Sequence, residues 1–242
     1  METFWRTIGA YNQGTWMFQI AILLIGITLT VGLVRKPSPL LKKAIKIYLI
    51  AIYLWIAIVY YLIYGSARSY YVVMAVYWLL MAVAWIFDLV FDSSTFERNK
   101  KYRILGYFLL FLPLLYPVFS IYRGLTFPEI TSPIMPCSIV TFTIGLLLLH
   151  SHRVNIFIIL LLCHWSLIGL TKTYFFDIPE DFILVGASVP ALYLFFKEYF
   201  LQDLHSDTKP KAKYINILLI MSCLLICFVL IATLLSEFSY DQ

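Results

Sequence analysis

Apolar residues are grouped into eight long runs, with polar and charged residues concentrated between them. The runs span residues 16–34, 44–64, 71–91, 104–122, 134–149, 154–170, 182–196 and 214–235. A bilayer core of about 30 Å needs about 20 helical residues. The first four runs and the last one reach this length, whereas the fifth, sixth and seventh are shorter. The pattern therefore predicts an all-α polytopic bundle of about eight transmembrane helices.

The basic residues lie between alternate runs. Fourteen of the 18 Lys and Arg residues follow the first, third, fifth or seventh run, and the other four lie in the remaining segments. Basic residues stay on the cytoplasmic side of a membrane. The alternation therefore predicts that the N-terminus and the C-terminus both lie outside. Removing one short run would place basic clusters on opposite sides, which favours eight spans.

The composition indicates a protein that lives within the bilayer. Hydrophobic residues make up 62% of the chain and charged residues 13%, against about a quarter charged in soluble proteins. We expect a single integral membrane domain over residues 1–242, with no soluble domain attached. Residues 1–14 predict either a helix lying on the membrane surface or a frayed end.

The net charge of +5 reports orientation rather than nucleic-acid binding. We expect the bilayer itself as the partner, with anionic lipid at the cytoplasmic basic clusters; the sequence leaves the oligomeric state open. The Lys residues expected at that surface are Lys42, Lys43, Lys46, Lys209, Lys211 and Lys213.

Tyrosines and one acidic residue stand out near the ends of the second and third runs. Tyrosines at the outer ends are typical of an aromatic belt at the headgroup level; these are Tyr60, Tyr61, Tyr64, Tyr70 and Tyr71. Asp88 is the only acidic residue within a run. We expect it to pair with Lys100, Lys101 or Arg103 in the next loop.

The three short runs, within residues 134–196, are candidates for the centre of the bundle. A short helix exposed to lipid suffers hydrophobic mismatch, whereas one surrounded by other helices does not. Residues 136–165 predict a hairpin of two short helices joined by a tight polar turn at 150–153. Local tilt and thinning of the bilayer would also accommodate short helices.

The hairpin carries the candidates for a solute path. His164 is the only histidine inside a run, and antiparallel pairing places it at the depth of Thr141. Buried polar groups in a membrane are costly and often functional. A hydrogen bond to Thr141 or Ser166 would equally satisfy a histidine with no other role. Cys137 at the outer mouth and Pro190 in the seventh run complete the predicted path.

A metal or redox site is an alternative interpretation. Cys223 and Cys227 are four residues apart and share a helical face, and Cys163 and His164 lie at a similar predicted depth. Thiolates and imidazole suit soft metals, although this spacing matches no established ligand pattern. Hydrolytic motifs and paired carboxylates at mid-membrane depth are absent from the sequence. The sequence therefore leans away from an enzyme and identifies no cofactor.

Several short motifs resemble an uncharacterised family of bacterial multi-pass membrane proteins. They are Tyr11-Asn12 with Trp16, Pro136-Cys137 with Thr141-Phe142-Thr143 and Gly145, Trp165 with Ile168-Gly169, and Ile178-Pro179-Glu180-Asp181. Ser138 stands where members of the family often have a second proline. The resemblance implies a bacterial inner membrane location and no particular reaction.

These patterns together favour transport or permeation of a small neutral or weakly polar solute past the short helices. Low charge within the runs argues against a multivalent ion. The alternatives are a membrane-embedded metal or redox protein and an accessory subunit of a membrane complex.

Overall fold

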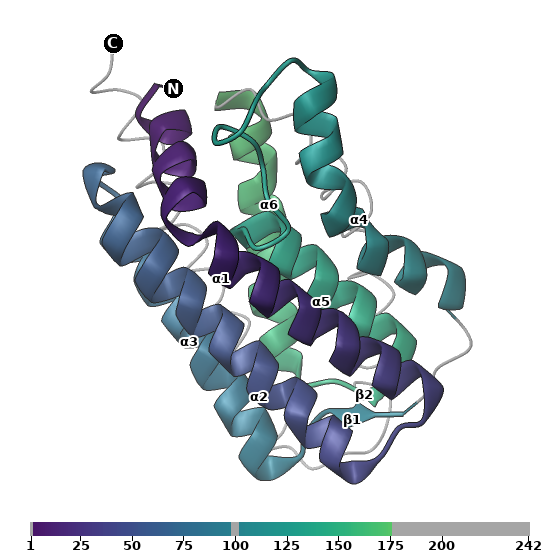
Figure 1. Ribbon diagram of the computed structural model, residues 1–242. Helices are drawn as coiled ribbons and strands as arrows, with labels where there is room; N and C mark the ends of the chain where they lie inside the picture. The colour runs from purple at the N-terminus through teal and green to yellow at the C-terminus, as the bar shows by residue number, and fades with distance from the viewer. Residues whose placement is uncertain (1, 98–101, 176–242) are drawn as a thin grey trace.

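The computed structural model describes residues 2–97 and 102–175, and these residues form six α-helices and one small β-ribbon (Figure 1). In chain order the elements are α1 (Glu2–Arg35), α2 (Pro39–Trp55), the π-helix η1 (Ile56–Tyr64), the 3-10 turn η2 (Gly65–Ala67), α3 (Tyr71–Phe91), β1 (Thr95–Phe96), α4 (Arg103–Tyr122), α5 (Pro136–His150), β2 (Ser151–Arg153) and α6 (Ile156–Phe175).

Four of these helical segments are long and apolar enough to cross a membrane, and α5 and the Ile156–Gly169 part of α6 are shorter apolar segments. The prediction of an all-α fold is therefore confirmed for the described residues, apart from the ribbon, and four helical segments could span a membrane as predicted. The first six predicted spans correspond to observed helices. The predicted spans at 182–196 and 214–235 lie outside the described residues, so the total of eight and the outward position of both termini stay predictions.

Local sequence explains where the second helix begins. The Ser38 side chain accepts a hydrogen bond from the Leu41 backbone N–H at 3.3 Å, and Pro39 occupies the first helical position. A serine cap followed by proline is a strong start signal, and it places the start before the apolar run at residue 44. After Trp55 the helix widens into η1, which ends at Tyr64, and Gly65 begins η2.

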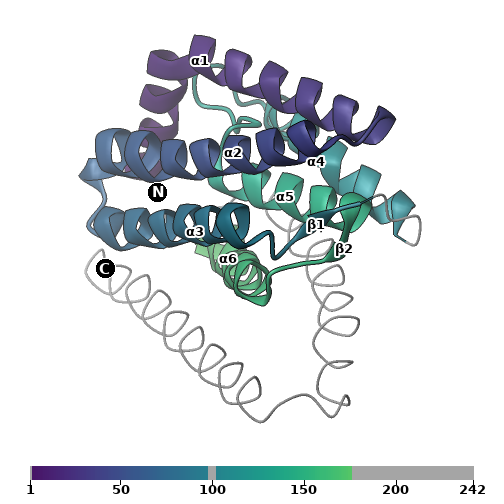
Figure 2. The same cartoon turned by 90° about the horizontal axis from the view of Figure 1, so that it is seen from below.

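The first helix is longer than its apolar run and begins at Glu2. Phe4, Ile8 and Tyr11 are buried, and the Tyr11 hydroxyl donates to the Ile134 carbonyl at 2.7 Å. Figures 1 and 2 show α1 bent, with its first turns at an angle to the rest. One face of residues 2–14 therefore packs against the protein, and the position of this segment relative to a membrane surface stays a prediction.

Helix α5 lies at the centre of the described bundle. Every residue of α5 except Phe142 is buried, which fits a helix that is apolar on all sides. It packs along α4, while α2 packs along α3, α1 lies along α2, and α6 contacts both α5 and α3 (Figure 2). A Cβ on Gly145 would meet the Gly106 carbonyl oxygen at 2.9 Å and the Leu110 amide nitrogen at 2.8 Å. The α4 and α5 backbones therefore meet closely because Gly145 has no side chain.

Helix α4 contains Pro113 and Pro117 and is visibly bent in Figure 1. An internal proline removes a backbone hydrogen bond and crowds the preceding turn, which explains the bend.

The connection between α5 and α6 differs from the predicted tight turn. Residues 151–153 form β2, which pairs antiparallel with β1, placing Thr95 opposite Arg153 and Phe96 opposite Ser151. His150 belongs to α5 and is buried. The ribbon therefore ties the end of α3 to the start of α6, a contact between segments far apart in the sequence.

Candidate functional site

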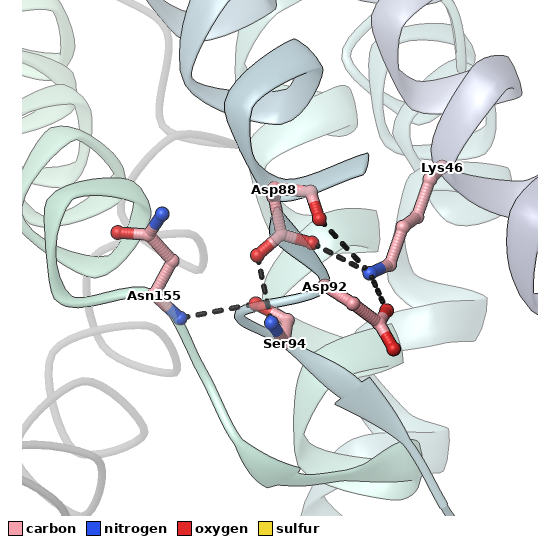
Figure 3. Close-up of polar contacts among 5 residues, drawn as sticks. All are labelled: Lys46, Asp88, Asp92, Ser94 and Asn155. Carbon is pink, nitrogen blue, oxygen red and sulfur yellow. Dashed lines mark hydrogen bonds and ion pairs between the residues drawn. The ribbon is translucent and has the colours of Figure 1, made fainter. Parts of the chain in front are cut away.

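A buried ion pair joins α2 to the end of α3. The Lys46 ammonium lies 3.0 Å from Asp88 Oδ2 and 2.7 Å from Asp92 Oδ1, and donates to the Asp88 carbonyl at 3.2 Å (Figure 3). Lys46 is 2% exposed and Asp88 is fully buried. The Phe96 ring lies 5.9 Å from the ammonium and adds a cation–π contact. A charged pair is thus held away from solvent at one end of the helical bundle.

The other carboxylate oxygen of Asp88 organises the segment that leads to α6. Asp88 Oδ1 accepts a hydrogen bond from the Ser94 backbone N–H at 2.8 Å. The Ser94 hydroxyl oxygen in turn accepts from the Asn155 backbone N–H at 3.0 Å, and Asn155 Oδ1 accepts from Phe157 N–H at 2.9 Å. Figure 3 shows Lys46, Asp88, Asp92, Ser94 and Asn155 converging from α2, α3 and the start of α6. We call these five residues the Lys46–Asp88 network.

Asp92 is the part of the network in contact with solvent. Its backbone is left-handed (φ 47°) at the end of α3, a conformation that Asp tolerates better than most residues. Its side chain is 82% exposed. The hydrogen bond from Lys46 is the main cause that lowers the pKa of the Asp92 carboxyl, with burial opposing it. Asp92 therefore remains ionised next to Lys46 at neutral pH.

The network corrects two expectations from the sequence. Asp88 pairs with Lys46 on α2. Of the expected loop partners, Arg103 forms no ion pair with Asp88, whereas Lys100 and Lys101 lie outside the described residues. Lys46 is buried in this pair and is unavailable as a surface contact for anionic lipid. The sequence does contain a signal for this pair. Lys46 and Asp88 both lie inside apolar runs, and because the two runs are consecutive and hence antiparallel, the start of one and the end of the other lie at the same side of the membrane.

A second buried charge, Arg68, lies in the segment between η2 and α3. Arg68 is 5% exposed, its guanidinium lies 4.7 Å from the Phe4 ring and 5.5 Å from the Tyr60 ring, and Nη2 donates to the Phe4 carbonyl at 3.4 Å. Its Nε has no hydrogen-bond partner in the structure. No carboxylate among the described residues pairs with Arg68. The Phe4 carbonyl and two aromatic faces take the place of a carboxylate partner.

This arrangement also corrects the predicted aromatic belt. Tyr60, Tyr61 and Tyr70 are buried, at 3%, 1% and 5% exposure, and Tyr64 and Tyr71 are half-buried. A belt at the headgroup level would leave these rings on the outer surface. Three of the five instead lie inside the protein, on the side of the bundle that holds Arg68.

The predicted path residues are buried but satisfied within their own helices. The Thr141 hydroxyl donates to the Cys137 carbonyl at 2.8 Å and the Ser166 hydroxyl to the Leu162 carbonyl at 3.0 Å. His164 Nδ1 lies 2.6 Å from the Leu160 carbonyl oxygen. The predicted hydrogen bond between His164 and Thr141 is not formed. Cys137 is 7% exposed, so it is buried rather than open at a mouth, and Pro190 lies outside the described residues.

The metal alternative remains a prediction. Cys163 is half-buried and adjoins His164 on α6, whereas Cys223 and Cys227 lie outside the described residues. Within residues 2–97 and 102–175, no three His, Cys, Asp or Glu side chains are grouped closely enough to hold a metal ion.

The four long apolar helices and the buried charges define the class: the chain has the features of a multi-pass membrane protein. It belongs to the family of unknown function DUF6064, which matches residues 1–206. The expected membership in a family of unknown function is therefore confirmed, whereas the bacterial origin stays a prediction. No curated protein and no solved structure matches the chain.

Proposed function

We propose that this protein lies in a bacterial inner membrane and allows a small neutral or weakly polar solute to cross beside α5, with the Lys46–Asp88 network closing one end of the path. The observation that carries the proposal is the buried ion pair. A desolvated pair contributes little net stability compared with apolar residues of the same volume. Ionisable groups within membrane segments are therefore candidates for function.

The position of the network supports a gating role. It holds α2, the end of α3 and the start of α6 together through successive hydrogen bonds. Separating Lys46 from Asp88 would free the β-ribbon and the first turn of α6 from α2. Asp92 is exposed and also pairs with Lys46. The lysine can therefore leave Asp88 and move toward solvent while it keeps Asp92 as its counter-charge.

The polar groups of α5 and α6 support the route. Thr141 on α5 and Ser166 on α6 are fully buried, and His164 on α6 is 6% exposed. Apolar residues at these positions would pack without needing a hydrogen-bond partner. The Thr141 and Ser166 hydroxyl protons are used within the helices, and the two hydroxyl oxygens keep acceptor capacity for a passing solute. Tyr53 extends this polar set, because its hydroxyl donates to Thr143 on α5 at 3.0 Å. Cys137 and Pro190 belong to the same proposed route.

The test is solute permeation in proteoliposomes. Purified protein would be reconstituted, and swelling would be followed by light scattering with urea, glycerol and erythritol as separate probes. We expect wild-type vesicles to swell faster than protein-free vesicles for at least one probe. His164→Gln and Thr141→Val should change that rate, while Phe108→Val on the exposed face of α4 should not. Swelling equal to that of protein-free vesicles for all three probes, with folded protein, would refute permeation of this class.

The same preparation tests the metal alternative. The contact of Nδ1 with the Leu160 carbonyl would direct His164 to bind a metal through Nε2, beside Cys163. Metal analysis should then find a stoichiometric ion that is lost equally from His164→Gln and Cys223→Ser. A fixed protein that co-purifies with the chain would favour the accessory-subunit alternative instead.

A further inference from the structure

An apolar groove runs along the seam between α1 and α4, with Phe142 of α5 in its lining, and it contains no residue of the network. It consists of three hollows in line, of about 200, 50 and 220 Å³. Ile27 and Leu114 line both the first and the second hollow, and Leu23 and Ile134 line both the second and the third. The hollows therefore form one elongated groove rather than separate cavities.

The groove opens toward the surface that the bilayer would cover. Its rim residues Ile27, Val31 and Phe111 are 40%, 41% and 61% exposed. The seam stays open because α1 packs along α2, whereas α4 is held against α5 by the Gly106–Gly145 contact. Large apolar side chains along an open seam require an apolar occupant.

Two polar features lie at one end of this groove. Arg35 lines the first hollow and is exposed, and no carboxylate of the described residues pairs with it. Thr30 lines the same hollow at 9% exposure, and its hydroxyl has no hydrogen-bond partner in the structure. A buried hydroxyl without a partner is costly. An occupant that bears a hydrogen-bond acceptor near Thr30 would remove this cost.

We propose that the groove binds an anionic phospholipid, with its phosphate at Arg35, an ester carbonyl at Thr30 and an acyl chain along Ile27 and Leu114. Thr30 is five residues before Arg35 on α1 and lies about 7.5 Å from it along the helix, on the apolar side of a phosphate held by Arg35. The stretch from Arg35 to Gly26 covers about 14 Å, close to one leaflet of a core about 30 Å thick. The part of the groove formed by the first two hollows thus matches a single lipid in its apolar length, its acceptor position and its charge.

The experiment measures lipid retained by the full-length protein. Protein purified from membranes containing phosphatidylglycerol and phosphatidylethanolamine would be washed in mild detergent and examined by native mass spectrometry. We expect about one phosphatidylglycerol per chain to survive. Arg35→Gln should reduce its occupancy about fivefold, the factor for one basic residue at an anionic lipid surface. Val31→Trp, which fills the rim, should abolish retention.

Matched variants separate this site from general attraction. Lys43→Gln removes an exposed charge near the same end of the bundle without lining the groove, and Val76→Trp adds a ring at a position 49% exposed on α3. Both should retain lipid as wild type does, and all variants should keep the wild-type elution volume and melting temperature in detergent. Equal retention by Val31→Trp and Val76→Trp would overturn the proposal. Equal retention of phosphatidylglycerol and phosphatidylethanolamine would also overturn it. The same holds if Val31→Trp dissociates an oligomer and leaves the amount of bound lipid unchanged.

Discussion

In the Lys46–Asp88 network, we expect removal of the lysine to destabilise the protein more than removal of the Asp88 charge. Lys46→Met leaves Asp88 fully buried without its cation. Removing one partner from a buried pair costs about 3–5 kcal/mol, so we expect a loss of that size in the free energy of unfolding. Asp88→Asn should cost less, about 1–3 kcal/mol, because Lys46 keeps its 2.7 Å contact with Asp92 and the amide oxygen can still accept from Ser94.

The double variant Lys46→Met/Asp88→Asn provides the decisive comparison. It leaves no charge buried at this position, and the asparagine retains the hydrogen bond to Ser94. We therefore expect the double variant to be more stable than Lys46→Met alone, since replacement of a whole buried pair is often nearly neutral. A double-mutant cycle isolates this coupling, which should lie within about 0.5–3 kcal/mol.

The assay is reversible unfolding in mixed micelles with increasing dodecyl sulfate, followed by tryptophan fluorescence. Lys43→Met, at an exposed position three residues away, is the control and should change stability by no more than about 0.5 kcal/mol. The reasoning is refuted if Lys46→Met behaves like Lys43→Met. It is also refuted if the double variant is as unstable as the sum of the two single variants.

Three further predictions concern other parts of the described structure. The pKa of the Asp92 carboxyl is lowered in the folded state. The stability that the ionised carboxylate contributes is therefore complete above the unfolded pKa of about 4 and is lost as the pH falls through the lower folded pKa. Asp92→Asn should abolish this acid-dependent loss in melting-temperature scans. Gly145→Ala should destabilise by about 1–3 kcal/mol, because its Cβ meets α4 backbone atoms, whereas Gly32→Ala, which meets only leucine methyl groups at 3.4 Å, should be tolerated in the same unfolding assay. Arg68→Gln should raise the melting temperature in detergent if aromatic faces compensate the charge incompletely, whereas a fall would show that the cation–π contacts outweigh its desolvation.

Much of the fold could be predicted from the sequence. The third run, residues 71–91, coincides with α3, and the fourth differs from α4 by one residue. Continuous apolar runs report spans reliably because backbone polar groups must be satisfied within each helix in a bilayer. The helix ends depend on local signals instead. Ser38 and Pro39 begin α2 before its apolar run, and polar residues from Glu2 onward continue α1.

The contacts between helices were less predictable. A membrane helix is apolar both on the face toward lipid and on the face toward the other helices. Hydropathy therefore does not show which face points inward. Tyr60 and Tyr61 were therefore assigned to a headgroup belt, although they are buried. The β-ribbon was missed because strands of two and three residues leave no periodic signal. Predicting the pair between Lys46 and Asp88 requires knowing that α2 and α3 are neighbours. The basic residues of the loop after α3 are closer to Asp88 in the sequence, which favours them as predicted partners.

The most direct measurement of the proposed path is the reactivity of a cysteine placed on it. In a chain whose native cysteines are replaced, Thr141→Cys lies on the proposed route and Phe142→Cys, on the one half-buried position of α5, lies beside it. The account predicts that a small water-soluble thiosulfonate reacts with position 141 faster than with position 142 when Asp88→Asn loosens the network, and that a permeant solute slows the reaction. Equal rates at the two positions, unchanged by Asp88→Asn, would contradict a path beside α5.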